Sequence, residues 1–105
     1  MFKSREEELV LKKHRHQQML KMFRETLTKV SNLNQAKLHI NVSAMFQGEQ
    51  FTFDITVFNQ GGDNTSLMIY DFWEVKQSQK LVDSLLTAIK TGDFEKVKIA
   101  ARGKL

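Results

Sequence analysis

The sequence predicts an α+β domain in which a three-stranded antiparallel β-meander is packed by helices. Two changes in the spacing of apolar residues lead to this prediction. A helical period near the N-terminus gives way to strict alternation in the middle of the chain, and the helical period then returns. Short segments that contain glycine separate the alternating stretches, as is typical of hairpin turns. The predicted element order is therefore α-β-β-β-α, followed by a short helical tail at the C-terminus.

Length and composition point to one domain and exclude several kinds of site. The 105 residues fit a single domain, residues 1–105, and 41% apolar with 27% charged residues is ordinary for a globular protein. The chain contains no cysteine, so it can form neither a disulfide nor a thiolate metal site. No apolar stretch approaches the roughly 20 residues of a membrane span, and no signal-peptide pattern opens the chain. We therefore expect a cytoplasmic protein that does not enter a membrane.

Residues 4–31 are expected to form a long helix. Ser4 and Glu7 match a capping box, in which two side chains satisfy free backbone N–H groups at the start of a helix. Apolar residues follow a regular helical spacing only in the second half, from Met19 to Val30. The second half should therefore pack on the core, whereas the polar first half projects from the domain or contacts another molecule.

Alternation with a period of two residues predicts three strands, over residues 37–46, 50–58 and 65–72. In the first two strands, apolar residues alternate with polar ones, so these strands form a hairpin with one core face. The apolar residues on that face are Leu38, Ile40, Val42, Ala44, Phe46, Phe51, Phe53, Ile55 and Val57.

The third strand is apolar on both of its faces. Leu67, Ile69 and Trp73 point to one side, and only one side of a strand can join the core. The residues on the other side are either covered by a helix of the same chain or exposed for contact with a partner protein or a second copy of the chain. In the second case, the predicted protein interface contains Met45, Phe58, Met68, Tyr70 and Phe72.

Residues 75–91 are expected to form the second helix, and Gly92 is suited to end it. The basic tail, residues 93–105, fits two patterns. Phe94 and Val97 lie at helical spacing, but the residues that follow Val97 also alternate as in a strand. We favour a short helix for this tail.

Charge is divided unevenly along the chain. Residues 1–30 hold eight Lys and Arg against four Glu, residues 31–75 hold one Lys against five acids, and residues 76–105 hold seven Lys and Arg against three acids. The basic helices therefore flank an acidic sheet region, and the two either neutralise each other or offer the helices to an acidic partner. If that partner is a nucleic acid, the predicted phosphate contacts are Lys12, Lys13, Arg15, Lys76 and Lys80.

The sequence contains no recognisable catalytic or metal-binding pattern. His14 and His16 stand two residues apart on a predicted helix, so they point to different faces and cannot share a metal ion. Asp54, Asp71 and Glu74 are the acids nearest the apolar sheet, but no histidine or nucleophile stands beside them in a known pattern. We therefore expect no enzyme activity, no cofactor and no metal.

The element order resembles that of double-stranded-RNA-binding domains. Members of that family open their last helix with a lysine cluster of the KKxAK kind, and the corresponding residues here run from Lys76 to Lys80. This stretch contains two lysines only, and Gln79 stands where the family has a small alanine. Because of this departure, no residue of this chain is assigned a role from the family.

These observations predict a small non-enzymatic regulatory or accessory protein. It would act by binding another protein or a second copy of itself through the extra apolar face of the third strand. The alternative hypothesis is a nucleic-acid-binding protein that uses its basic helices on the phosphate backbone.

Overall fold

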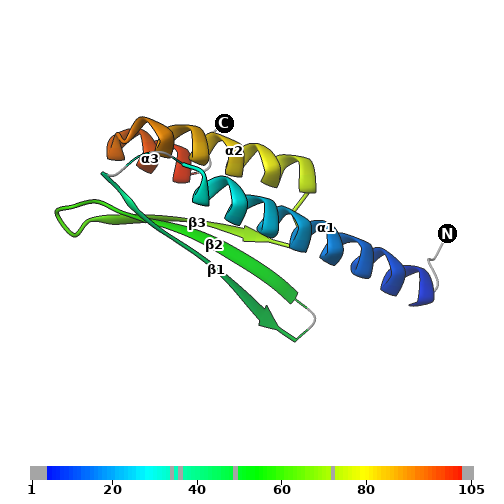
Figure 1. Ribbon diagram of the computed structural model, residues 1–105. Helices are drawn as coiled ribbons and strands as arrows, with labels where there is room; N and C mark the ends of the chain where they lie inside the picture. Colours follow the sequence, from blue (N-terminus) through cyan, green and yellow to red (C-terminus); the bar gives the residue numbers. More distant parts are fainter. Residues whose placement is uncertain (1–4, 34, 36, 49, 72, 103–105) are drawn as a thin grey trace.

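In the part of the chain that the structure describes, three helices lie on one face of a three-stranded sheet (Figure 1). The structure is a computed structural model and describes residues 5–33, 35, 37–48, 50–71 and 73–102, without the side chains of residues 5, 6, 8–10 and 12. In chain order the elements are α1 (Arg5–Ser31), β1 (His39–Gln47), β2 (Gln50–Phe58), β3 (Asn64–Tyr70), α2 (Val75–Thr91) and α3 (Phe94–Ala101).

The predicted α+β class and element order are confirmed. The strands are antiparallel and follow the order β1-β2-β3, which is the predicted meander. The ends of the strands and of both long helices lie within two residues of their predicted positions.

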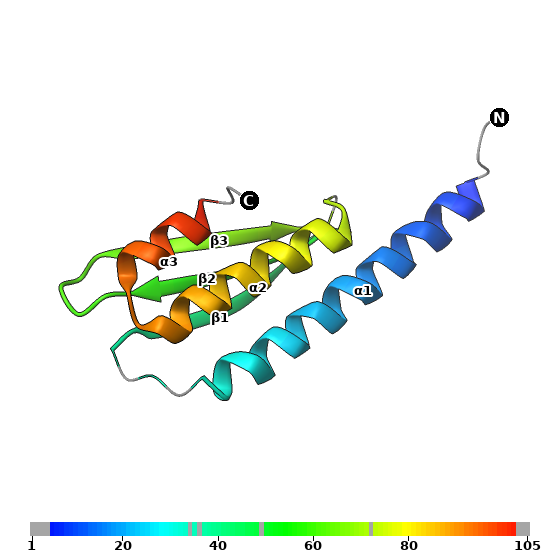
Figure 2. The same cartoon turned by 90° about the horizontal axis from the view of Figure 1, so that it is seen from above.

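α1 packs on the domain only through its second half. Met19 and Met22 are buried there, and the buried Thr26 hydroxyl donates to the Met22 carbonyl oxygen at 2.8 Å. The first half extends beyond α2 and the sheet (Figures 1 and 2), and Leu11 is exposed on it. The prediction for this helix is confirmed, because only the second half has the apolar stripe that a core can accept.

β1 and β2 form the predicted hairpin, which closes between Gln47 and Gln50. Gly48 lies in the turn with a φ of +63°, a left-handed conformation that glycine adopts without steric cost. The helix-facing side chains of β2 are all buried, and they are Phe51, Phe53, Ile55 and Val57.

The helix-facing side of β1 is covered less well than the sequence predicts. Ile40 and Val42 are half-buried, but Ala44 is exposed and Phe46 is 61% exposed. Figure 1 shows that the tip of the hairpin bends away from α1. The His16 ring of α1 still lies 5.6 Å from the Phe46 ring, but it leaves most of that side chain exposed. The expectation that Ala44 and Phe46 belong to the core is therefore wrong, although both residues lie on the predicted face of the strand.

β3 ends at Tyr70, two residues before its predicted end, because the chain turns at Asp71. The Asp71 carboxylate accepts a hydrogen bond from the Phe51 N–H at 2.8 Å, and the Trp73 N–H donates to the Tyr70 carbonyl oxygen at 3.2 Å. The sequence predicts that Trp73 points to the same side as Leu67 and Ile69, and Trp73 does pack against the core. Trp73 lies after the strand and is half-buried.

Replacing Asp71 with alanine is expected to lower the free energy of unfolding by about 1–3 kcal/mol, because the Phe51 N–H loses its acceptor. Asp71→Asn is the matched control, since its amide oxygen can still accept this hydrogen bond. Urea unfolding followed by circular dichroism measures both losses. Equal losses in the two variants would mean that the hydrogen bond contributes nothing, contrary to this prediction.

α2 crosses the middle of the sheet and α3 lies over β3 (Figure 2). Gly92 ends α2 with a φ of +74°, and the Asp93 carboxylate begins α3 by accepting the Glu95 N–H at 3.0 Å. In α3, Val97 is buried while Ile99 is 59% exposed. The helical interpretation of the tail is therefore confirmed over these residues, and the alternating pattern has no structural meaning there.

Candidate protein-binding site

Three of the predicted interface residues meet at one end of the sheet face that points away from the helices. Thr52 of β2 lies between Met45 of β1 and Tyr70 of β3, which are its partners on the two neighbouring strands. Met68 stands two residues before Tyr70 in β3, so its side chain points to the same face. Met45 is 58% exposed and Met68 is 42% exposed. Among the described residues, no helix lies on this face (Figure 1). The hypothesis that a helix of the same chain covers these side chains is therefore wrong.

The other two predicted interface residues do not complete the patch. Phe58 lies on the same face and is exposed, but it is six residues from Thr52 along β2, a distance of about 20 Å. Phe72 lies outside the described residues. We use the name outer patch for Met45, Met68 and Tyr70 alone.

A row of polar side chains separates the outer patch from Phe58. The Ser43 hydroxyl donates to Asp54, and the same carboxylate accepts the Thr56 hydroxyl at 2.9 Å. The hydroxyl oxygens of Thr56 and Ser66 are also 2.9 Å apart. These side chains satisfy one another in a manner typical of a solvated sheet surface, so the apolar character of this face is concentrated in the outer patch.

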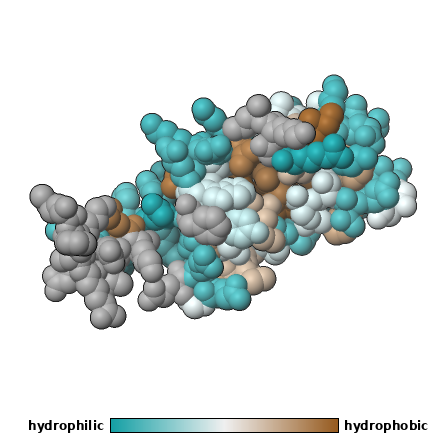
Figure 3. Space-filling view, turned by 180° about the vertical axis from the view of Figure 1, so that it is seen from behind, coloured by the Kyte–Doolittle hydropathy of each residue, from teal (hydrophilic) through white to brown (hydrophobic). Residues whose placement is uncertain are grey.

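A cleft continues from the outer patch around the edge of β3 toward α2 and α3. Its volume is about 660 Å³, which is enough for a large side chain or a small ligand. On the side of the molecule that carries β3 and α3, apolar residues gather between hydrophilic ones (Figure 3). We name this cavity the β3-edge cleft, and its lining residues are Leu67, Met68, Tyr70, Trp73, Glu74, Gln77, Leu81, Ala101 and Arg102.

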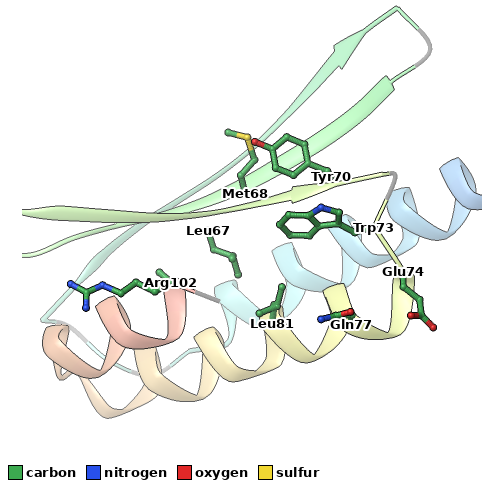
Figure 4. Close-up of a pocket in the computed structure, with 9 residues that line it drawn as sticks. Leu67, Met68, Tyr70, Trp73, Glu74, Gln77, Leu81 and Arg102 are labelled. Atoms are coloured by element: carbon green, nitrogen blue, oxygen red, sulfur yellow. The ribbon is translucent and has the colours of Figure 1, made fainter. Parts of the chain in front are cut away.

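The β3-edge cleft is aromatic and aliphatic in the middle and charged at its ends. The Tyr70 and Trp73 rings pack edge to face, with centroids 5.1 Å apart and planes at 65°. Figure 4 shows Trp73 between Tyr70 and α2, with Glu74 and Arg102 at opposite ends of the lining. Such an arrangement can hold an apolar side chain in the centre and orient its polar neighbours at the rim.

Trp73 is a residue of this site that the sequence does not reveal, because alternation assigns it to the opposite face from Tyr70. Asp71 is the signal that could have revealed it. A carboxylate that follows Leu67 and Ile69 on the core face is unsuited to burial, which indicates that the strand ends before it. Once the strand ends at Tyr70, the turn brings Trp73 back against the Tyr70 ring.

The residues predicted to contact nucleic acid fall into two groups. Lys13 and Arg15 are exposed on the first half of α1, and Lys76 and Lys80 are exposed on the first turns of α2. The backbone of Lys12 belongs to α1, but its side chain is not among those described. The structure therefore places these residues on two helices of the same layer.

Ion pairs neutralise part of the charge within this helical layer. Lys29 and Asp83 lie 3.3 Å apart and join α1 to α2. Lys21 pairs with Glu25 at 4.0 Å, and Lys98 pairs with Glu95 at 3.0 Å, each within one helix. None of these three pairs joins a helix to the sheet. They are exposed pairs and contribute little to stability.

The described ranges also bear on metal binding and on membrane spans. No group of three His, Asp or Glu side chains there is arranged to hold a metal ion. No helix there is both long enough and apolar enough to cross a membrane.

Comparison of the chain with family models, with curated proteins and with solved structures found no match. Function is therefore inferred from the geometry and chemistry of the outer patch and the β3-edge cleft.

Proposed function

We propose that the protein is a small non-enzymatic regulatory or accessory protein that acts by binding another protein at the outer patch and the β3-edge cleft. The supporting observation is that Met68 and Tyr70 belong to both surfaces, so an exposed apolar patch leads directly into a cleft with aromatic walls. Binding energy at protein interfaces is concentrated in aromatic and methionine anchors that fill such cavities.

The charge of the region indicates the chemistry of the partner. Asp54 lies opposite Met68 on the outer face, Glu74 and Arg102 line the cleft, and residues 31–75 as a whole hold five acids against one lysine. Complementary charge speeds encounter and suppresses wrong partners. The partner is therefore a protein segment with an apolar anchor side chain on a basic surface.

Trp73 allows a direct test, because it is the one tryptophan of the chain and it lines the β3-edge cleft. A protein captured from cell extract by the immobilised chain is purified and titrated into the free chain. Insertion of an anchor into the cleft should change the intrinsic fluorescence of Trp73, with excitation chosen for tryptophan. The partner's own tryptophans are accounted for with a Trp73→Phe variant. A partner that binds while the Trp73 signal stays unchanged would place the interface elsewhere and contradict the proposal.

Nucleic-acid binding is a second candidate, supported by the exposed Lys13, Arg15, Lys76 and Lys80 on the helical layer. If these four residues contact phosphates, affinity for DNA or RNA should fall roughly 100-fold between 50 and 200 mM salt, because each contact releases counterions. Fluorescence anisotropy with single- and double-stranded probes measures this. The double variant Lys76→Glu/Lys80→Glu should weaken binding to all probes alike, since phosphate contacts carry no sequence information. If the chain binds no DNA or RNA, or if its affinity does not depend on the salt concentration, this candidate function is excluded.

A further inference from the structure

The second edge of the sheet is formed by β1, along which α1 runs in the helical layer (Figure 2). β1 itself lacks the charges, proline and bulge that often protect an edge strand. Its nine residues contain no Asp, Glu, Lys, Arg or Pro, and they pair with β2 residue for residue without a bulge. Residues 43–47 are all exposed. Native proteins usually block such an edge with charges, proline, a bulge or a covering element, because its free backbone groups can pair with another strand.

One hydrogen bond identifies the backbone groups that face this free edge. The Phe51 N–H donates to Asp71, on the β3 side of β2, so it does not point toward its β1 neighbour Phe46. In an antiparallel pair, residues that do not exchange hydrogen bonds with one neighbouring strand turn their N–H and C=O groups to the other side. By alternation along β1, the backbone groups of Ile40, Val42, Ala44 and Phe46 therefore face outward.

We propose that β1 pairs antiparallel with β1 of a second copy of this chain, which joins the two three-stranded sheets into one. With Ser43 opposite Ser43 of the second copy, all nine residues of the strand are paired. On the helix-facing side, Phe46 then lies opposite Ile40 of the second copy, and Ala44 lies opposite Val42. The exposed ring of Phe46 gains an apolar neighbour that its own helical layer does not supply.

The distribution of charge favours self-pairing of two copies through β1 over self-pairing through β3, the other edge of the sheet. Antiparallel self-pairing of β1 brings no two like charges together, because the strand carries none. β3 is also uncharged, but Asp63 and Asp71 flank it. Self-pairing of β3 about Leu67 would set Asp63 opposite Asp71 of the second copy, and like charges directly opposite each other are destabilising.

This pairing uses the β1 edge and leaves the β3-edge cleft open. Met45 of the outer patch would lie opposite Asn41 of the second copy with its side chain still on the outer face, so the pairing and the proposed function can each fail without the other.

Analytical ultracentrifugation at several protein concentrations tests the proposal. The wild-type chain should show twice its monomer mass of 12.2 kDa at high concentration and should dissociate on dilution. The dimer should persist at high salt, because no charged residue of β1 takes part in it. A chain that stays monomeric, or a dimer that salt dissociates, would overturn the proposal.

Two variants and one control locate the interface. Ala44→Pro removes an outward N–H in each copy and should raise the dimer dissociation constant roughly 100-fold, while the β1–β2 hydrogen bonds remain. Phe46→Lys places a charge at the edge in an exposed position, so it should have the same effect even if the proline variant fails to fold. Met68→Lys, on β3, should leave the dimer intact. A dimer that survives both β1 variants, or that only Met68→Lys disrupts, contradicts the assignment to β1.

Discussion

Replacing Phe53 with alanine is expected to lower the free energy of unfolding by about 3–5 kcal/mol. Phe53 is 1% exposed, and its ring packs against Phe23 of α1 at 5.5 Å and against Phe51 at 6.2 Å. Truncation removes one of the aromatic contacts between the sheet and α1 and leaves a cavity that the surrounding strands cannot close. This is a large part of the stability of an ordinary small domain, so urea unfolding should detect it readily.

Phe46→Ala is the matched control, because Phe46 is the same residue type on the same face of the sheet. It is 61% exposed at the hairpin tip, so its truncation should cost less than about 1 kcal/mol. Both variants are compared at a protein concentration at which the wild-type chain is monomeric. Similar losses in the two would show that the hairpin tip is packed as firmly as the middle of the sheet, contrary to the fold described above.

Met68→Glu is expected to weaken binding of the partner protein at least roughly 30-fold, or about 2 kcal/mol. Met68 lies where the outer patch meets the β3-edge cleft, so a charge there faces the apolar anchor of the partner. The change does not require the core to move, because Met68 lies on the face of the sheet that points away from the helices. Because Met68 is 42% exposed, the free energy of unfolding should change by less than about 1 kcal/mol. Isothermal titration calorimetry measures the affinity, and urea unfolding measures the stability.

Phe58→Glu is the control on the same face of the sheet. Phe58 is an exposed apolar residue beyond the polar row around Asp54, well separated from the cleft. This variant should bind the partner like the wild-type chain. A loss of affinity in Phe58→Glu as large as in Met68→Glu would mean that the whole sheet face is the interface and that the cleft has no special part in it.

The sequence predicts those parts of the fold that depend on local periodicity. Alternation in β2 correctly identifies four buried residues, and the position of Gly92 correctly ends α2. These features are predictable because a period of two residues, or a left-handed glycine, has the same meaning in nearly every fold. The two-sided apolar pattern of β3 predicts that one of its two sets of side chains lies away from the core, and the structure shows that this set includes Met68 and Tyr70.

The sequence does not predict which faces the helices cover. Alternation places Ala44 and Phe46 on the helix-facing side of β1, but their exposure depends on the direction of α1 relative to the hairpin tip. Phe58 is assigned to the correct face, yet its distance from Met45 depends on the register of the hairpin. Alternation reports the side of a strand and carries no information about the packing of distant elements against it.

The β3-edge cleft was beyond prediction for the same reason. It forms where the end of β3 and the start of α2 meet the last turn of α3, near Arg102. Its aromatic wall also requires the turn at Asp71 that brings Trp73 back onto Tyr70. The meeting of β3, α2 and α3 depends on contacts between segments that are separate in the sequence, whereas the contact between Tyr70 and Trp73 is local and Asp71 could have indicated it.

The most direct test of the proposed function is to map the partner's contact surface by NMR, with the isotope-labelled chain and the unlabelled partner. If the partner binds as proposed, backbone amide signals should shift for residues 67, 68, 70, 73, 74, 77, 81, 101 and 102, which line the β3-edge cleft. Signals from Lys13 and Arg15, on the projecting half of α1, should stay unchanged. Shifts confined to α1 or to the exposed side of α2, with the cleft unaffected, would contradict the proposal and place the interface on the basic helices.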